Sequence, residues 1–325
     1  MLIALEEHYA WNPPSSGNVV ATWLQSHNPT AYQRLYDRGS LRLEQMDAAG
    51  IDFQILSLFD PGVQEDEDTA RAVDNARRAN DDLAETVRAT PDRFGGFATL
   101  ATQEPDAAAA ELERAVEELG LVGGLINGHT RGRYLDDPAY LGLFECAQHL
   151  GVPIYLHPTT PHPAVMDAWF APYVKDGLHL ASWGFAAETG THALRLIYSG
   201  LFDKFPRLQM ILGHLGEMLP YAAYRLDRYY GLGGGDDGGQ LAKRPSQYLC
   251  DNFHITTSGN FSPTTFACAL EVMGPDRLMF SVDYPMDDNV DGAQFLRDLQ
   301  VDDDVRRKIA GDNALGLFGD KIPRR

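Results

Sequence analysis

Short apolar runs alternate along the chain with longer segments in which apolar residues recur every three or four positions. The apolar runs predict eight strands, at residues 2–8, 52–58, 94–100, 122–128, 152–158, 208–214, 252–258 and 277–283. Segments such as 70–89, 106–119 and 140–150 have the helical period and lie between strands. Nearly continuous apolar strands are typical of parallel sheets that are covered on both faces. The alternation therefore predicts one domain over residues 1–325, a (β/α)8 barrel of the TIM type.

Two segments are longer than a minimal barrel needs. They follow the first and fifth predicted strands, at residues 9–38 and 159–190. Because the loops after barrel strands form the active-site mouth, we expect both insertions to form walls of a pocket. The glycine-rich stretch at 231–240 predicts a surface loop. No GxGxxG motif follows the first strand, which disfavours a dinucleotide-binding sheet.

Acidic and imidazole side chains lie where several predicted strands end. The first strand ends in Glu6-Glu7-His8, the fifth in His157 and the eighth in Asp283. Side chains alternate along a strand, so Glu6 and His8 point the same way and Glu7 points the opposite way. Since all strands of such a barrel open at one end, we expect one divalent ion to be held by four residues: Glu6, His8, His157 and Asp283. Two imidazoles and two carboxylates suit Zn²⁺ or Mn²⁺, and the sequence does not choose between them.

Each of these residues has a structural alternative when it is considered alone. A histidine at a strand end is often only hydrogen-bonded, and Glu6 could pair with an arginine. Asp283 precedes Tyr-Pro and could be a turn residue or a helix N-cap. The metal hypothesis therefore depends on the convergence of the four side chains at one end of the barrel.

His214 and Glu217 are three residues apart, where we expect a helix to begin after the sixth strand. Residues at this spacing share a helical face. A carboxylate beside an imidazole orients it and raises its basicity, which suits a general acid–base pair. The alternative is that Glu217 only interacts favourably with the helix N-terminus.

Composition narrows the class of function. The formal net charge of the 325-residue chain is −19, and this disfavours a nucleic-acid surface. Apolar residues make up 44%, without a run of membrane-spanning length, and the first residues do not resemble a signal peptide. We therefore expect a cytoplasmic protein without membrane or nucleic-acid partners. The three cysteines are widely spaced and predict neither disulfides nor a thiolate zinc site.

Several motifs together resemble the amidohydrolase-2 branch of the amidohydrolase superfamily. They are ALEEH, YLHP, ETGTHALRLIYSGLFDKFPRLQMILGHLGEMLPY, DNFHITTSGNF and FSVDYP. More closely, nearly the whole chain is similar to the nonoxidative aromatic acid decarboxylases, which act on γ-resorcylate (2,6-dihydroxybenzoate), 2,3-dihydroxybenzoate and 5-carboxyvanillate. The resemblance implies a metal-dependent barrel that forms a homo-oligomer, a dimer or tetramer.

The resemblance also implies roles for individual residues. Asp283 would be a metal ligand and the proton donor, and His214 with Glu217 the acid–base pair. Arg225 matches an arginine that contacts the substrate and reaches a neighbouring subunit. Trp23 and Trp183 are candidates to stack on an aromatic ring, with ordinary packing as the alternative.

The implied activity is carbon–carbon lysis in the catabolism of aromatic compounds. An ortho-hydroxybenzoate such as 2,6-dihydroxybenzoate would lose CO2 and leave a phenol, with one divalent ion and no organic cofactor. Retention of His8 favours the resorcylate type over the 2,3-dihydroxybenzoate type, whereas the two insertions depart from the resorcylate pattern. The alternatives are a metal-dependent hydrolase of a lactone or amide and a metal-free binding protein on the same scaffold.

Overall fold

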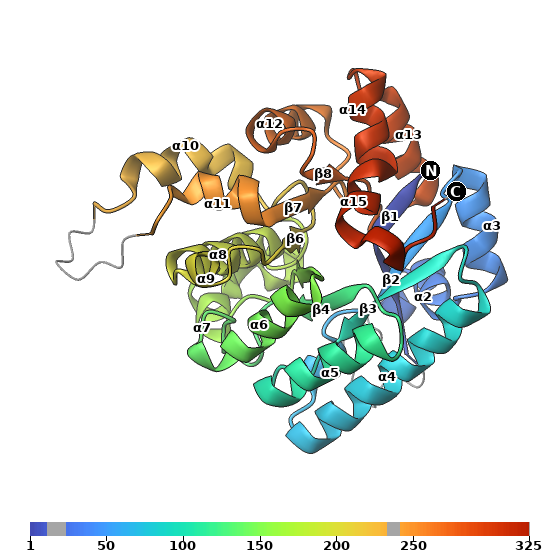
Figure 1. Ribbon diagram of the computed structural model, residues 1–325, viewed down its shortest axis with the longest axis horizontal. Coiled ribbons are helices and arrows are strands. Elements are labelled where there is room, and N and C mark those ends of the chain that lie inside the picture. The colour runs from blue at the N-terminus through green and yellow to red at the C-terminus, as the bar shows by residue number, and fades with distance from the viewer. Residues whose placement is uncertain (12–23, 233–240, 325) are drawn as a thin grey trace.

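The fold is an eight-stranded parallel barrel surrounded by helices (Figure 1). The structure, a computed structural model, describes residues 1–11, 24–232 and 241–324. The strands pair in chain order and are β1 (Ile3–Tyr9), β2 (Phe53–Leu58), β3 (Phe94–Thr99), β4 (Gly123–Asn127), β5 (Ile154–His157), β6 (Met210–Leu212), β7 (Phe253–Thr256) and β8 (Leu278–Met279). The predicted (β/α)8 barrel is confirmed, and all eight strands lie where the apolar runs placed them.

Helices lie on the outer side of the strands in Figure 1. They are α2 (Pro29–Tyr36), α3 (Ser40–Ala49), α4 (Thr69–Ala89), α5 (Pro105–Glu117), α6 (Leu141–Leu150), α7 (Pro163–Val165), α8 (Gly184–Tyr198), α9 (Leu201–Lys204), α10 (Leu219–Tyr229), α11 (Pro245–Asn252), α12 (Pro263–Met273), α13 (Asn289–Asp298), α14 (Asp303–Arg307) and α15 (Asn313–Phe318). Helix α4 illustrates how the sequence specifies them. The Asp68 side chain caps its first turn, and apolar residues three or four positions apart form its buried face: Ala72, Ala76, Ala79 and Leu83.

Two layers of apolar side chains form the core. The larger layer lies between the strands and the helices. The smaller layer fills the inside of the barrel with inward-pointing residues that include Ile3, Leu5, Phe53, Ile55, Phe97, Tyr155, Ile211 and Met279. Phe318 of α15 and Ile322 pack against this inner layer. The barrel interior is therefore a packed core, and the open space for chemistry lies at its mouth.

The barrel closes where the first and last strands meet. We predicted the eighth strand at 277–283, but β8 contains only Leu278 and Met279. The residues that follow still contact β1: the His8 N–H donates to the Tyr284 carbonyl (2.7 Å), and the Asp283 N–H donates to the Glu6 carbonyl (3.1 Å). The seam thus depends on a few hydrogen bonds at the end that carries the polar residues.

A β-bulge interrupts β1 between Ala4 and Glu7, where the register against β2 shifts. Leu5 points into the barrel core, and Glu6 points inward as well, because the bulge changes the alternation of side chains. The hydroxyl of Ser281 accepts from the N–H groups of Leu5 (3.2 Å) and Glu6 (2.6 Å). It also donates to Glu7 Oε1 (3.0 Å). One buried hydroxyl therefore satisfies both backbone donors of the bulge.

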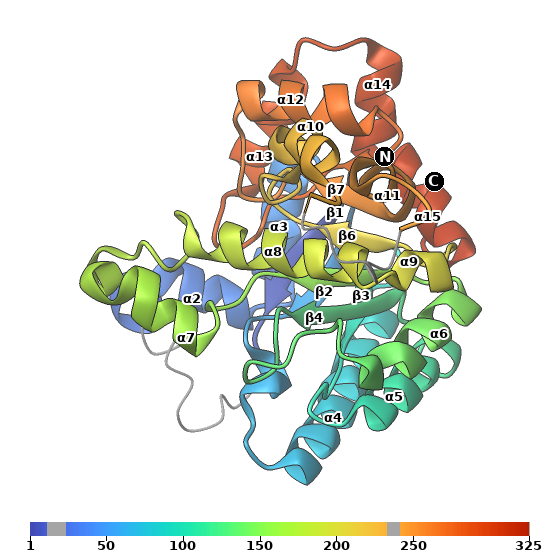
Figure 2. The ribbon, with the colours of Figure 1, turned by 90° about the vertical axis from the view of Figure 1, so that its left-hand side faces the viewer.

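The two predicted insertions contain different helical segments. The first contains α2, and its residues 12–23 lie outside the described part of the chain. The second contains α7 and two short helical segments, Met166–Phe170 and Ala171–Asp176, before α8 begins at Gly184. The predicted range of 159–190 was therefore too long at its end, because it included the first turns of α8. Both α2 and α7 extend toward the left side of the molecule in Figure 2.

In the ranges that the structure describes, no helix is both long and apolar enough to cross a membrane. Most of the glycine-rich stretch predicted as a surface loop, residues 233–240, lies outside those ranges. The three cysteines are free thiols in partly buried positions.

Replacement of Ser281 by Ala should destabilise the barrel at its seam. The Leu5 and Glu6 N–H groups would lose their buried acceptor, and we expect the free energy of unfolding to fall by about 2 kcal/mol. Urea denaturation of the variant and the parent measures this change. Ser182→Ala, at an exposed site, is the matched control and should change stability by less than about 0.5 kcal/mol. An equal effect of the two substitutions would contradict a special role for Ser281.

Candidate metal centre and active site

The four residues that we predicted as metal ligands converge at the mouth of the barrel. They come from three strand ends: Glu6 and His8 from β1, His157 from β5, and Asp283 from the segment after β8. One ligand atom of each lies within 4.8 Å of the ligand atoms of the others. Glu6 Oε1 lies 3.3 Å from His157 Nε2, and Asp283 Oδ1 lies 3.1 Å from His8 Nε2. We call these four residues the metal-type group, and their oxygen and nitrogen atoms are suited to one divalent metal ion.

Two atoms of this group are buried and have no hydrogen-bond partner in the protein. They are Glu6 Oε1 and His8 Nε2. Burial without a partner is unfavourable for a polar atom, and most strongly so for a charged oxygen. A cation between them would interact with both atoms. The unpartnered atoms are therefore an independent sign that the residues present fit a metal ion.

Neighbouring groups fix the orientation of each ligand. Ser57 Oγ lies 3.1 Å from His8 Nδ1, and the Pro158 carbonyl lies 2.8 Å from His157 Nδ1. Both imidazoles therefore keep Nε2 directed toward the group, as is common for metal-binding histidines. The hydroxyls of Tyr155 and Ser258 donate to Glu6 Oε2 and leave Oε1 toward His157.

The electrostatics of these ligands agree with the same interpretation. Burial is the main cause, and the neighbouring His8 the second, that holds the pKa of His157 well below its usual value, so this imidazole stays neutral. Burial raises the pKa of Glu6. A neutral imidazole is the form that binds metal, and a buried carboxylate is stabilised by a nearby cation.

The sequence predictions did not include the residues that orient the ligands. Two of them had a readable signal. Tyr155 precedes His157 by two residues and so shares its face of β5. Ser258 belongs to the ITTSGNF motif that carried the family resemblance. Ser57 and Ser281 had no comparable signal, because a lone serine in an apolar strand does not indicate a partner across the barrel.

His214 and Glu217 form a pair, but not on a helix as we predicted. Residues 214 to 218 all have positive φ, between 50° and 84°, and α10 begins only at Leu219. In this left-handed turn His214 Nδ1 and Glu217 Oε1 are 2.7 Å apart. The predicted contact between the two side chains is present, but the predicted helix is wrong. Positions three apart also meet on one side of a left-handed turn.

Contacts from β7 and from Ser258, two residues after it, hold this turn in an unfavourable backbone conformation. Left-handed geometry costs roughly 1–2 kcal/mol for an ordinary L-residue. The His214 N–H donates to Ser258 Oγ (3.1 Å), and the Leu215 N–H donates to the Thr256 carbonyl (2.8 Å). The turn also needs space, because a Cβ at Gly190 of α8 would lie 2.8 Å from the Glu217 carbonyl oxygen. Strain maintained in this way is typical of functional sites.

Among the four ligands, Asp283 lies beside both His8 and His214. Its Oδ1 faces His8, and its Oδ2 lies 3.6 Å from His214 Nε2. Burial alone would raise the pKa of Asp283, but the nearby His214 and His8 imidazoles outweigh it and hold the pKa well below the usual value. Burial alone would lower the pKa of His214, but Glu217, Glu6 and Asp283 raise it well above the usual value. The pair therefore rests as a carboxylate beside an imidazolium.

Apolar side chains line part of the mouth next to this group. The Phe59 ring meets the His8 ring edge-on, with centroids 5.6 Å apart. Phe59 belongs to a small cluster with Ala10, Tyr32 and Met286, which gathers residues from α2 and from the segments after β1, β2 and β8. Such a surface suits a flat apolar ligand.

Three residues were predicted to contact the substrate: Trp23, Trp183 and Arg225. Trp23 is outside the described residues. Trp183 precedes α8 and its surface is 48% exposed, while Arg225 lies on the exposed side of α10 with its guanidinium 5.0 Å from the centre of the Tyr229 ring. Among the described residues, no hydrogen bond or ion pair joins Trp183 or Arg225 to the four predicted ligands, and their roles at the substrate stay predictions.

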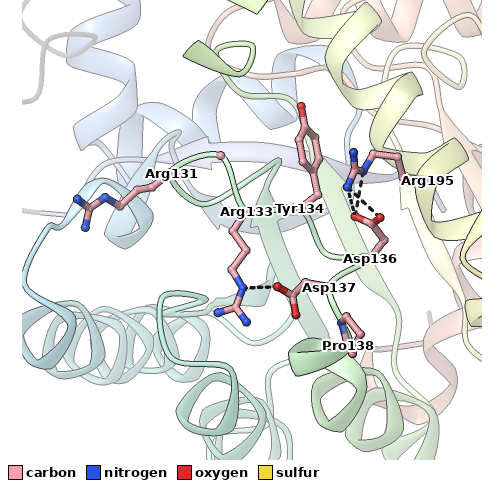
Figure 3. Close-up of a pocket in the computed structure, with 8 residues that line it drawn as sticks. Arg131, Arg133, Tyr134, Asp136, Asp137, Pro138 and Arg195 are labelled. Atoms are coloured by element: carbon pink, nitrogen blue, oxygen red, sulfur yellow. Dashed lines mark hydrogen bonds and ion pairs between the residues drawn. The ribbon is translucent and has the colours of Figure 1, made fainter. Parts of the chain in front are cut away.

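A separate surface pocket follows β4 (Figure 3). Arg195 makes two hydrogen bonds of 2.9 Å to Asp136, and Arg133 donates to Asp137 at 2.9 Å. These two arginines are paired with carboxylates in the pocket wall, whereas Arg131, which also lines the pocket, donates among the described residues only to the Glu67 carbonyl, at 3.4 Å.

Comparison with known proteins agrees with the geometry. The amidohydrolase family model matches residues 8–319. The chain is 42% identical to γ-resorcylate decarboxylase from Polaromonas sp. strain JS666, over 97% of this chain and 98% of the relative. It superposes with a TM-score of 0.88 on crystal structures of a 2,6-dihydroxybenzoate decarboxylase and of a dihydroxybenzoic acid decarboxylase. One holds 2,6-dihydroxybenzoate (39% identity, 98% of both chains). The other, from Polaromonas sp. JS666, holds manganese and the inhibitor 2-nitroresorcinol (40% identity, 98% of this chain and 96% of that one). The resemblance read from the sequence is thus confirmed: the chain belongs to the amidohydrolase family.

Proposed function

We propose that the protein is a metal-dependent carboxy-lyase that removes CO2 nonoxidatively from an ortho-hydroxybenzoate of the 2,6-dihydroxybenzoate type. The observation that carries this proposal is the position of Asp283, which faces the metal-type group with one oxygen and the His214 imidazole with the other. Relatives that span almost the whole chain and act on such acids support the substrate class. Glu6, His8, His157 and Asp283 would hold the ion.

A bound divalent ion of the zinc or manganese type would neutralise the substrate carboxylate and lower the pKa of its ortho phenol. The protein must then deliver one proton to the ring carbon that bears the carboxyl group. Asp283 rests as a carboxylate, so it needs a proton first, and the His214 imidazolium is the nearby source. Glu217 keeps His214 protonated and fixes its ring through Nδ1.

The proton and electron pairs balance without a redox cofactor. Asp283 transfers its proton to the ring carbon, which interrupts aromaticity. The bond between that carbon and the carboxyl group then breaks, CO2 leaves, and the bonding pair restores the aromatic ring. His214, which gave its proton to Asp283, then takes a proton from solvent, so the net reaction consumes one proton.

We further propose that the enzyme is a homo-oligomer in which Arg225 contacts the substrate bound in a neighbouring copy. Helix α10 exposes Tyr221 (86%) and Tyr224 (78%), an unusual surface for an isolated chain. Arg225 lies on the same helix, is exposed, and has its guanidinium 5.0 Å from the centre of the Tyr229 ring. Contact with a second copy would cover the tyrosines and bring this guanidinium to a carboxylate. Trp183, which is also exposed, could be covered in the same way.

Asp283→Asn should lower kcat by roughly 10²- to 10⁴-fold for a hydroxybenzoate that the parent enzyme decarboxylates, because the amide cannot deliver the proton. Liquid chromatography of substrate and phenol measures the rate, and metal analysis checks that the ion is still bound. Asp302→Asn, at an exposed site before α14, is the control and should leave kcat unchanged. Turnover near the parental rate in Asp283→Asn would exclude Asp283 as the donor. Hydrolysis of simple lactones without loss of CO2 would instead favour the hydrolase alternative.

Glu217→Gln should move the basic limb of the pH–rate profile to lower pH. Glu217 is the largest influence that raises the pKa of His214, so its neutral replacement lets the imidazolium lose its proton earlier as pH rises. The measurement is kcat against pH for parent and variant. A uniform loss of rate with the limb in its original place would contradict this role.

Complementation tests the role of Arg225. Arg225→Met and Asp283→Asn chains should each be nearly inactive alone. After co-refolding in equal amounts they should recover roughly a quarter of parental activity in a dimer, because half of the pairs are mixed and each holds one intact site. Mixtures without recovered activity would place Arg225 in its own site or outside catalysis.

A further inference from the structure

Asp60 is a buried acidic residue at the barrel mouth that the mechanism above does not use. It follows β2 by two residues and is only 6% exposed. Its Oδ1 is buried without a hydrogen-bond partner, and none of the arginines or lysines in the described ranges forms an ion pair with it. Burial raises the pKa of this carboxyl to about 7. An acid with a free oxygen is unfavourable in such a place unless a ligand or water completes it.

The Asp60 carboxyl lies over the opening of the barrel. It interacts with the side chain of Thr159 through a hydrogen bond, and Thr159 follows β5 by two residues. Strands β3 and β4 lie between β2 and β5 in the sheet. A contact between residues after β2 and β5 must therefore pass across the mouth rather than along one strand pair.

This side of the mouth adjoins the metal-type group. Ser57 and Phe59, just before Asp60, both contact His8. In β4, which neighbours β5, Asn127 pairs in register with His157. Its Oδ1 is buried and has no hydrogen-bond partner. The ends of β2 and β4 thus present two buried acceptors without a donor, next to the place where an aromatic acid would bind.

We propose that Asp60 is a specificity-determining residue that accepts a hydrogen bond from a second hydroxyl group on the ring of the aromatic acid. The inference rests on the proposed function and assigns one residue of this chain to the second ring hydroxyl of its dihydroxybenzoate substrate. A site that is built to bind a hydroxyl discriminates strongly against analogues that lack it, because its own polar atom is then left unpaired.

The test compares Asp60→Ala and the nearly isosteric Asp60→Asn with the parent on three acids. They are the best-used dihydroxybenzoate, the same acid with its second hydroxyl methylated, and 2-hydroxybenzoate. For the parent, kcat/KM should be roughly 10- to 100-fold higher for the dihydroxy acid than for the methyl ether. Asp60→Ala should lose this preference and change kcat/KM for 2-hydroxybenzoate by less than about 3-fold. Asp60→Asn, which keeps one acceptor oxygen, should lie between them.

Controls separate this inference from a structural role and from the proposed function. Asp74→Ala, on the exposed side of α4, should leave all three values unchanged. If the Asp60 variants lower kcat/KM equally for all three acids, or retain the preference, the inference is overturned while decarboxylation by the parent still stands. If the parent decarboxylates none of the acids, the proposed function itself fails. Retained metal content and thermal midpoint exclude misfolding as the cause of a lost preference.

Discussion

The bulge in β1, held by the hydroxyl of Ser281, is the constraint on which the rest of the site depends. Without it, strict alternation would direct either Leu5 or Glu6 away from the barrel interior. With it, Leu5 completes the core and Glu6 turns to the metal-type group in the next position. The same hydroxyl connects β1 to the segment that carries Asp283. One local irregularity thus couples the core, the seam and the ligands.

The strained turn that carries the acid–base pair also depends on support from a neighbouring strand. A left-handed turn of several ordinary residues is unfavourable by itself, and Thr256 at the end of β7 and Ser258 just after it stabilise the turn. Ser258 also donates to Glu6. The side chain that fixes the His214 backbone therefore also fixes a ligand, so the acid–base pair and the metal-type group are aligned by shared contacts.

The sequence was sufficient for the barrel and for the convergent residues, since both follow from periodicity and from the common opening of parallel strands. It was insufficient where geometry departs from the regular periods. The short β8 and the turn around His214 are held by contacts between distant segments, which a local pattern does not encode. Ser281 was missed for the same reason: its partners on β1 are more than 270 residues away along the chain. Asp60 was missed because the proline after it reads as an ordinary turn.

The short β8 has a consequence for how the barrel opens. A divalent ion held by Glu6, His8 and Asp283 would join the first strand to the segment after the last, and so close a loop of nearly the whole chain. Loss of the ion would leave this joint to a few hydrogen bonds, and separation there would expose the unpaired backbone of β1 as an edge strand. Exposed edges of this kind pair with other chains. In this fold, the ion that serves the chemistry would also protect the protein from self-association.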